Sequence, residues 1–217
     1  MIEYFNEDCM AGMARYPDKH FDLAIVDPPF GIGNFVQTTG RVRGKAVTWN
    51  NEIPPDDYFI ELRRVSKNQI IWGANYFNCF QAGKGAIVWY KHVPPECNMS
   101  ECVIASCSMQ KRITAIDYPW SNINRGEKMI HPCQMPVAVY KWQLANYAKQ
   151  GDLILDTHVG SASSLIACHD MGFDAVGFEL DPDYYKASKQ RLEDFMAQPS
   201  LDELVVEQRE QIGLEGL

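Results

Sequence analysis

The architecture of this chain follows from one segment, Phe21-Asp22-Leu23-Ala24-Ile25-Val26-Asp27-Pro28-Pro29-Phe30. Its apolar run, residues 23–26, has the length and branching of a short buried strand. The two prolines that follow lack a backbone N–H and cannot continue a sheet ladder, so the strand must end before them. The segment therefore predicts a stiff loop at the carboxyl end of a strand, where open α/β sheets bind their ligands.

The predicted loop carries three groups that could bind one planar ligand: the Asp27 carboxylate, the Pro28 carbonyl and the Phe30 ring. The oxygens can accept hydrogen bonds from an exocyclic amine, and the ring can stack on the plane that carries this amine. A strand that ends in a proline-rich turn with a solvated aspartate explains the same residues. The segment alone leaves both interpretations open.

The length and composition predict one domain, with room for a small insert. A chain of 217 residues, 46% of them hydrophobic, can bury a full core. No apolar run is long enough to span a membrane, and the amino terminus lacks a signal-peptide pattern. Seven cysteines, an odd number in a chain too long to need disulfides, predict a reduced, cytoplasmic protein. The formal net charge of -8 means that a polyanion would have to bind a local basic patch.

Strand-like and helix-like segments alternate along the chain, which predicts an α/β fold with a doubly wound, mostly parallel sheet. Strands are expected at residues 1–4, 23–26, 69–72, 85–90, 99–106, 111–116, 153–156 and 175–178, and helices at 10–16, about 54–65, about 136–150, 165–171 and 182–196. The strands around 99–116 follow one another without a helix and predict an antiparallel edge. Residues 1–198 are expected to form the single domain. Residues 199–217 would be a tail that either packs as an amphipathic helix or frays.

Residues 31–51 lack periodicity and are predicted to form a long loop. Loops of this length in compact domains are usually functional or disordered. Arg41, Arg43 and Lys45 within it could contact a phosphate backbone, although a solvated loop explains them equally well.

Three cysteines, Cys97, Cys102 and Cys107, follow His92 at regular spacing. Structural zinc sites pair their cysteines more closely, two to four residues apart. On a strand, Cys102 and Cys107 would also point to opposite faces. No metal site is therefore predicted.

The second half of the chain has the pattern of a nucleotide-binding βαβ unit. The strand 153–156 ends in a carboxylate and is followed by a loop of small residues, 157–164, and then by a helix. The next strand ends at Glu179, about twenty residues after the loop, where such units place the acid that binds ribose hydroxyls. Loop, helix, strand and terminal acid together predict an adenosine-containing ligand.

Asp27-Pro28-Pro29-Phe30 resembles the catalytic motif of the S-adenosylmethionine-dependent DNA amino-methyltransferases. Residues 156–164 together with Phe178-Glu179-Leu180-Asp181 are similar to the cofactor motif of that family. His131-Pro132-x-Gln134-x-Pro136 resembles the segment before the cofactor strand, and Asn6-Glu7-Asp8-Cys9 resembles the opening segment. The catalytic motif comes first and the cofactor loop last, which is the circularly permuted order of the β class.

This resemblance extends over most of the chain, from about residue 6 to residue 192, and implies a Rossmann-like methyltransferase fold. It implies S-adenosyl-L-methionine as cofactor and double-stranded DNA as partner, with methyl transfer to the N6 amine of a flipped adenine. The Asp27 carboxylate and the Pro28 carbonyl would accept the two amine hydrogens, while Phe30 stacks on the base. Gly160 would hold the methionine part, Glu179 the ribose and Asp8 the adenine side.

The site residues that the resemblance implies fall into three sets. The catalytic set is Asp27, Pro28, Pro29 and Phe30. The cofactor-binding set is Asp8, Cys9, Asp27, Asp156, Thr157, His158, Gly160, Ser161, Ala162, Glu179 and Leu180. The DNA-binding set joins basic residues of the 31–51 loop to those near the short target-recognition insert at 91–127: Arg41, Arg43, Lys45, Lys111, Arg112 and Arg125.

The cofactor loop departs from the usual family sequence, Asp-Pro-Phe-x-Gly-Ser-Gly, at two positions. His158 stands where the family has Phe, and Ala162 stands where it has the second Gly. If the backbone at residue 162 needs a positive φ, alanine costs about 1 kcal/mol or more there. Weaker cofactor binding is the expected consequence.

Several alternatives remain open from the sequence. Aspartate in first place of the catalytic motif favours adenine N6, because serine is usual in the cytosine-N4 enzymes. Cytosine-N4 methylation is therefore the nearest alternative. An RNA or protein methyltransferase could use the same amine pocket, and a DNA- or cofactor-binding relative without catalysis would explain the altered loop. A homodimer is compatible with the sequence but not required by it.

Overall fold

A computed structural model describes residues 1–33, 35–36, 46–47, 49–97, 99–120 and 129–198 of the chain. The predicted tail at 199–217 lies outside the described residues, as do the predicted DNA-binding residues Arg41, Arg43, Lys45 and Arg125.

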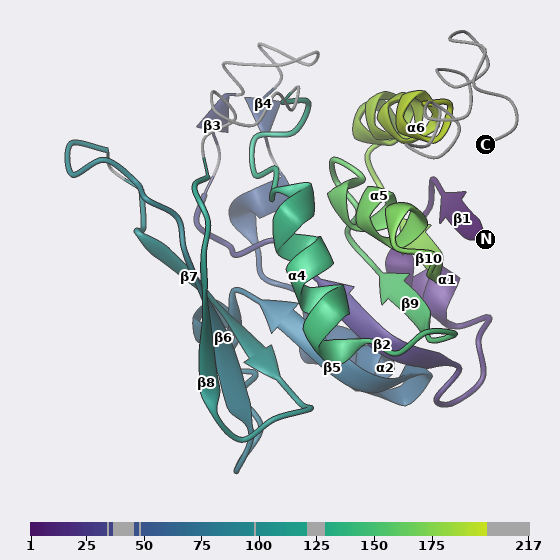
Figure 1. Ribbon diagram of the computed structural model, residues 1–217, viewed down its shortest axis with the longest axis horizontal. Helices are drawn as coiled ribbons and strands as arrows, with labels where there is room; N and C mark the ends of the chain where they lie inside the picture. The colour runs from purple at the N-terminus through teal and green to yellow at the C-terminus, as the bar shows by residue number, and fades with distance from the viewer. Residues whose placement is uncertain (34, 37–45, 48, 98, 121–128, 199–217) are drawn as a thin grey trace, which may run out of the picture.

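Strands and helices alternate as the sequence predicts (Figure 1). The strands are β1 (Ile2–Phe5), β2 (Phe21–Val26), β3 (Phe35–Val36), β4 (Ala46–Val47), β5 (Ser66–Trp72), β6 (Gly85–Tyr90), β7 (Cys102–Cys107), β8 (Ile113–Asp117), β9 (Leu153–Asp156) and β10 (Asp174–Phe178). The helices are α1 (Cys9–Met13), a short 3-10 helix η1 (Trp49–Asn51), α2 (Asp56–Val65), α3 (Ala74–Phe77), α4 (Val137–Tyr147), α5 (Ser163–Asp170) and α6 (Pro182–Met196).

Local sequence signals account for the helix boundaries. Asp181 caps α6 because its side chain accepts hydrogen bonds from two backbone N–H groups of the first turn, and Pro182 suits the first helical position. The acidic first turn and basic last turn of α2 both complement the helix dipole. Several elements differ from the predictions. The segment 31–51, expected to be a loop, contains β3, β4 and η1. Helix α1 already ends at Met13, and α3 follows β5 at a position where no helix is expected.

Eight strands form one sheet in the order β1-β10-β9-β2-β5-β7-β6-β8. β1, β10, β9, β2 and β5 pair in parallel, β7 pairs antiparallel with β5 and β6, and β8 pairs parallel with β6. This confirms the mostly parallel, Rossmann-like sheet. It refines the predicted antiparallel edge, because the reversed strand β7 lies inside the sheet, between β5 and β6. The chain then passes β6 and forms β8 at the edge of the sheet.

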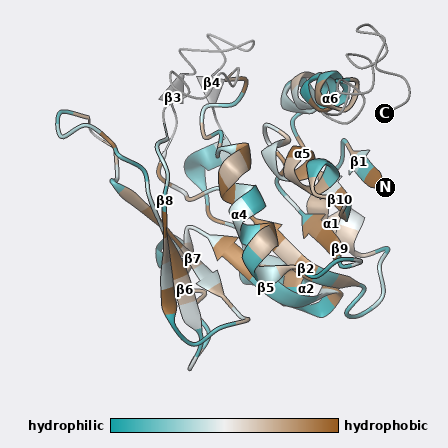
Figure 2. Cartoon of the chain, in the orientation of Figure 1, coloured by the Kyte–Doolittle hydropathy of each residue, from teal (hydrophilic) through white to brown (hydrophobic). Residues whose placement is uncertain are grey.

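Helices cover both faces of the sheet, and β2 shows why (Figures 1 and 2). Leu23 and Ile25 pack in a cluster with residues of α4, α5 and α6, whereas Ala24 and Val26 pack in a second cluster with residues of α1 and α2. Alternate side chains of a strand point to opposite faces, so a continuous apolar run buries both faces of the sheet. The hydrophobic colouring in Figure 2 accordingly follows the strands.

None of the helices in the described ranges is long and apolar enough to cross a membrane. Within the same ranges, no group of three or more His, Cys, Asp or Glu side chains is arranged to hold a metal ion.

Candidate active site

A cavity of about 860 Å³ opens at the carboxyl end of the parallel strands. The loops that follow β2, β6, β9 and β10 all contribute to its lining, together with the start of α1 and the segment before α4. Cavities of this volume commonly hold small molecules and cofactors. The sheet thus brings together the two halves of the site that the sequence predicts separately.

Nearly all the predicted catalytic and cofactor residues reach this cavity. Those that line it are Asp8, Cys9, Asp27, Pro28, Pro29, Phe30, Thr157, His158, Gly160, Ser161, Glu179 and Leu180. Asp156 and Ala162 are buried and do not line the cavity, but both belong to the segment that forms its cofactor loop.

The Asp27 carboxylate directly follows β2 and offers a buried hydrogen-bond acceptor. Among the described residues, its Oδ1 atom is buried and has no hydrogen-bond partner. Burial and, to a smaller extent, the nearby Asp156 carboxylate together raise the pKa of Asp27 to about 7, while Lys91 opposes the shift. A buried polar atom without a partner is costly. The position therefore suits a ligand that donates an N–H group.

The Phe30 ring is held by neighbours far away in the sequence. Its backbone N–H donates to Oδ1 of buried Asn50 over 2.9 Å. Its ring stacks on Tyr76 with centroids 5.0 Å apart and planes inclined by 14°. At Gly73 the backbone φ is +75°, and a Cβ atom would lie 2.3 Å from the Phe30 ring. Only glycine at this position leaves room for the ring.

Asp156 and Glu179 fix the cofactor loop through its backbone. Asp156 accepts a hydrogen bond from the His158 N–H over 3.0 Å and another from the Ser164 hydroxyl. The Glu179 carboxylate accepts the Gly160 N–H over 2.9 Å, which ties the loop to the end of β10. Burial raises the pKa of Asp156 to about 6 and that of Glu179 to about 7.

His158 presents a neutral ring where the family has phenylalanine. Burial lowers its pKa to about 4, so the imidazole carries no charge at neutral pH. Its Nδ1 atom lies 2.9 Å from the Thr157 hydroxyl, which in turn lies 2.7 Å from the Tyr58 hydroxyl. The Tyr58 ring also packs edge-on against the imidazole. A neutral, fixed ring can occupy the place of phenylalanine without adding positive charge.

Ala162 adopts the left-handed backbone conformation that the family glycine predicts. Its φ is 63° and its ψ is 21°, at the residue that precedes α5, and its side chain is fully buried. The loop therefore keeps the backbone path of the glycine-containing motif at the cost of local strain.

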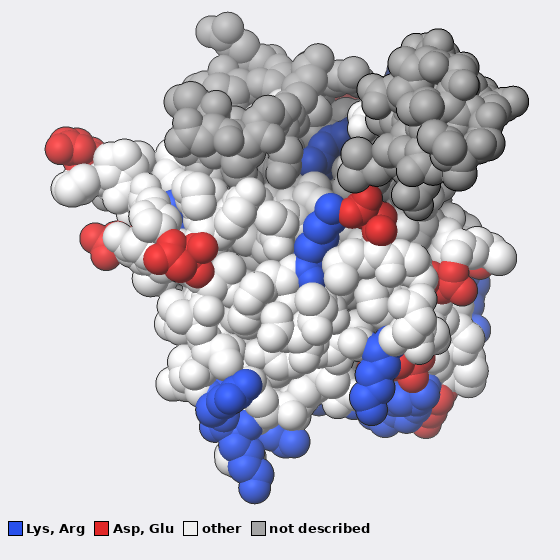
Figure 3. All heavy atoms as spheres, viewed as in Figure 1, with Lys and Arg blue, Asp and Glu red and all other residues white. Residues whose placement is uncertain are grey.

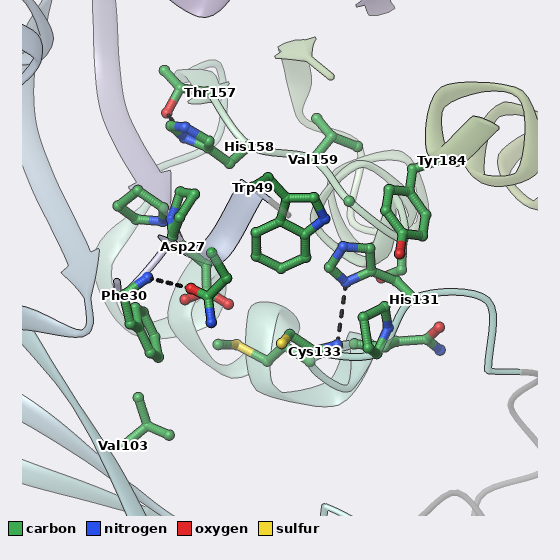
Figure 4. Close-up of a pocket in the computed structure, with 18 of the residues that line it drawn as sticks. Asp27, Phe30, Trp49, Val103, His131, Cys133, Thr157, His158, Val159 and Tyr184 are labelled. Carbon is green, nitrogen blue, oxygen red and sulfur yellow. Dashed lines mark hydrogen bonds between the residues drawn. The ribbon is translucent and has the colours of Figure 1, made fainter. Parts of the chain in front are cut away.

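An aromatic wall closes the cofactor side of the cavity (Figure 4). The rings of Trp49 and His131 stack with centroids 5.4 Å apart, and His131 packs edge-on against Tyr184 at 4.5 Å. The His131 ring also lies against Gly160, where a Cβ atom would be 3.5 Å from it. Trp49 comes from the predicted loop at 31–51, so this segment contributes to the cavity through η1.

Residues 67–190, more than half of the chain, match the family model of N6/N4 DNA methylases. The chain belongs to this DNA methylase family. At 26% identity it resembles YubD of Escherichia coli (strain K12), described as a "putative methylase", over 88% of this chain and 90% of that protein. A shorter stretch of 74 residues is 31% identical to the type II methyltransferase M.HpaI of Haemophilus parainfluenzae and covers 34% of this chain and 24% of that enzyme.

Solved structures of other methylases share the fold. The M1.HpyAVI–SAM complex matches with a TM-score of 0.58 at 17% identity, over 88% of this chain and 100% of that one. The cytosine-N4-specific PvuII DNA methyltransferase also matches with a TM-score of 0.58, at 14% identity, over 89% of this chain and 90% of that one.

Two predicted DNA-binding residues of this methylase lie away from the cavity. Lys111 and Arg112 form the turn before β8, and backbone hydrogen bonds join this turn to the amino end of β6. The cavity instead receives the carboxyl end of β6. Lysine and arginine side chains gather at the far end of these strands in Figure 3. The two residues are therefore not placed to guide a base into the cavity.

The sequence interpretation also missed residues that line the cavity, notably Asn50, Tyr76 and Lys91. Asn50 and Tyr76 carry no motif, and only their contacts with Phe30 identify them. Lys91 follows an apolar strand directly, and that position is a signal that could have identified it.

Proposed function

We propose that this DNA methylase transfers a methyl group from S-adenosyl-L-methionine to the N6 amine of an adenine flipped out of double-stranded DNA. The observation that carries the proposal is the buried, unpartnered Oδ1 atom of Asp27 beside the Pro28 carbonyl and the Phe30 ring. An exocyclic amine supplies the donor that this oxygen lacks.

The cavity residues fit the cofactor. The Glu179 carboxylate reaches the cavity from the end of β10, where βαβ units bind ribose hydroxyls, and Asp8 lines the same side. The backbone of Gly160 can approach a ligand closely because the residue lacks a side chain. Several carboxylates and a neutral His158 make the surroundings favourable for a positively charged sulfonium group. When bound, S-adenosyl-L-methionine supplies an electrophilic methyl group.

The catalytic loop would orient the amine and stabilise the charge that it acquires. Asp27 and the Pro28 carbonyl would each accept one amine hydrogen, which directs the nitrogen lone pair toward the methyl group. The amine nitrogen would form a bond to the methyl group as the bond from methyl to sulfur breaks, and it would become positive. The Asp27 carboxylate would offset this charge, and loss of one N6 proton to solvent would give the neutral methylamine. Phe30 would supply the stacking surface that a flipped base needs.

The choice of adenine over cytosine rests on the aspartate in first place of the catalytic motif. The fold does not discriminate, because a cytosine-N4-specific enzyme is among the structures that share it. Both bases carry an exocyclic amine beside an unprotonated ring nitrogen.

The test is incubation of the protein with methyl-labelled S-adenosyl-L-methionine and unmethylated DNA, followed by digestion to nucleosides. We expect the label in N6-methyladenine. Label in N4-methylcytosine would move the specificity to the alternative base. Bound DNA without label would contradict methyl transfer and favour a relative that has lost catalysis, and transfer to RNA or protein alone would contradict DNA as the substrate.

A further inference from the structure

Lys91 is a buried side chain without a partner in the cavity. It directly follows β6, is 7% exposed and lines the same cavity as Asp27. Its backbone is fixed at both ends, since its N–H donates to the Glu101 carbonyl and its carbonyl accepts the Trp120 N–H, each over 2.9 Å. Its Nζ atom makes no hydrogen bond or ion pair with the part of the chain that the structure describes. The Lys91 side chain is mostly buried, but it lines the cavity, so its donors are available to a ligand bound there.

Asp27 and Lys91 together form an incomplete pair of hydrogen-bonding groups. Asp27 offers a buried acceptor without a donor, and Lys91 lines the cavity with no side-chain hydrogen bond or ion pair to the described residues. The two are close enough for Lys91 to lower the pKa of Asp27, yet they form no ion pair. A group that carries a donor beside an acceptor would satisfy both side chains at once.

The Watson–Crick edge of adenine has this arrangement, since the N6 amine donates and the neighbouring ring nitrogen N1 accepts. Cytosine offers the same pair in N4 and N3. Guanine and thymine carry an N–H at the corresponding ring position, which a lysine ammonium cannot accept because it has no lone pair. We propose that Lys91 donates a hydrogen bond to N1 of the flipped adenine while Asp27 holds its N6 amine. The inference rests on the proposed function and assigns a base-reading residue to the same site.

The surroundings of Lys91 favour a base over a DNA phosphate. Phosphates lie on the outside of the duplex, whereas Lys91 is buried inside the cavity. Burial lowers the pKa of Lys91, but the ammonium and amine forms both keep N–H donors. The contact with N1 therefore does not depend on one charge state.

The contact is tested by a double-mutant cycle in which one change is made in the protein and the other removes the N1 acceptor from the substrate base. The substrates are two duplexes with the mapped target site, one with adenine and one with 1-deazaadenine, which lacks the N1 acceptor. The proteins are wild type, Lys91→Met and the matched control Lys84→Met, which changes an exposed lysine before the amino end of β6. Rates are measured at pH 8.5, where Asp27 is ionised. A cytosine target would be tested with 3-deazacytosine in the same way.

We expect kcat/KM of the wild type to fall about 10- to 100-fold on the deaza duplex, as for loss of a hydrogen bond to a charged group. Lys91→Met should show a similar loss on adenine and no further loss on 1-deazaadenine. Lys84→Met should behave as the wild type. Lys91→Gln keeps an N–H donor and should retain part of the preference for adenine, which separates the contact from a general effect of substitution on folding.

Three results would overturn the inference. The wild type could have the same kcat/KM on both duplexes. Alternatively, Lys91→Met could lose activity on the 1-deazaadenine duplex by the same factor as on adenine, so that the two effects are independent. Lys91→Met could also weaken both duplexes equally with a reduced salt dependence, which identifies a phosphate contact. Absence of transfer to the unmodified duplex by the wild type would instead contradict the proposed function, so the two failures are distinguishable.

Discussion

Replacing Ala162 by glycine is expected to leave the free energy of unfolding nearly unchanged, although the side chain is fully buried. Its φ of 63° lies in the left-handed region, which costs a non-glycine residue about 1 to 2 kcal/mol. Glycine relieves this strain but loses a buried methyl group worth about 0.8 kcal/mol. It also adds about 0.4 to 1 kcal/mol of conformational freedom to the unfolded chain. The gains and losses cancel to within about 0.8 kcal/mol on these magnitudes.

Ala167 provides the matched control for this prediction, because it is equally buried but lies within helix α5. Ala167→Gly removes the same methyl group and adds the helical cost of glycine, so we expect a loss of about 2 kcal/mol. Urea unfolding of wild type, Ala162→Gly and Ala167→Gly measures both changes. Equal destabilisation by the two substitutions would refute the strain assigned to Ala162.

Three further predictions follow from the buried carboxyls and from the packing of Phe30. Burial raises the pKa values of Asp27, Asp156 and Glu179 to about 7, 6 and 7, so the folded protein binds their protons more tightly than the unfolded chain. The free energy of unfolding should therefore increase as the pH falls from about 8 to 5, and a flat profile in urea titrations would contradict the raised values. The kcat/KM for DNA should decrease about tenfold per pH unit below the pKa of Asp27, since the carboxylate must accept the amine hydrogen, and a pH-independent rate would exclude this role. Gly73→Ala should slow methyl transfer by about 100-fold while cofactor binding in calorimetry stays unchanged, because the new Cβ displaces the Phe30 ring.

The control for the Gly73 substitution is Gly83→Ala. Gly83 has a similar φ of +72°, but a Cβ atom there would meet nothing within 4 Å. This variant carries the same backbone strain without contact to Phe30 and should methylate DNA at the wild-type rate. A loss of activity in both variants would show that strain, and not displacement of the ring, is responsible.

The sequence predicts the parts of the site that are encoded locally. The prolines after residue 26 end β2 where the sheet opens, and the apolar run before them forms a strand buried on both faces. The acid at the end of β10 is likewise found where the βαβ pattern places it. In each case neighbouring residues alone determine the local structure.

Features that depend on distant contacts could not be predicted in this way. Asn50 comes from a segment without periodicity, and its hydrogen bond to Phe30 joins residues 20 positions apart. Tyr76 belongs to the short helix α3, which has too few residues to show a pattern. The position of β7 inside the sheet depends on strand order, which hydrophobic periodicity does not encode. The burial of Lys91 appears only once the loops around β6 are in place.

The role of Asp27 is tested most directly by single-turnover methyl transfer with labelled cofactor, comparing the wild type with Asp27→Ala. Cofactor binding by both proteins is measured by calorimetry in the same buffer. We predict labelled N6-methyladenine from the wild type, no transfer by Asp27→Ala, and cofactor affinities within about threefold of each other, a difference of less than about 0.7 kcal/mol. Methyl transfer by Asp27→Ala at a rate near that of the wild type would contradict the central role of this carboxylate.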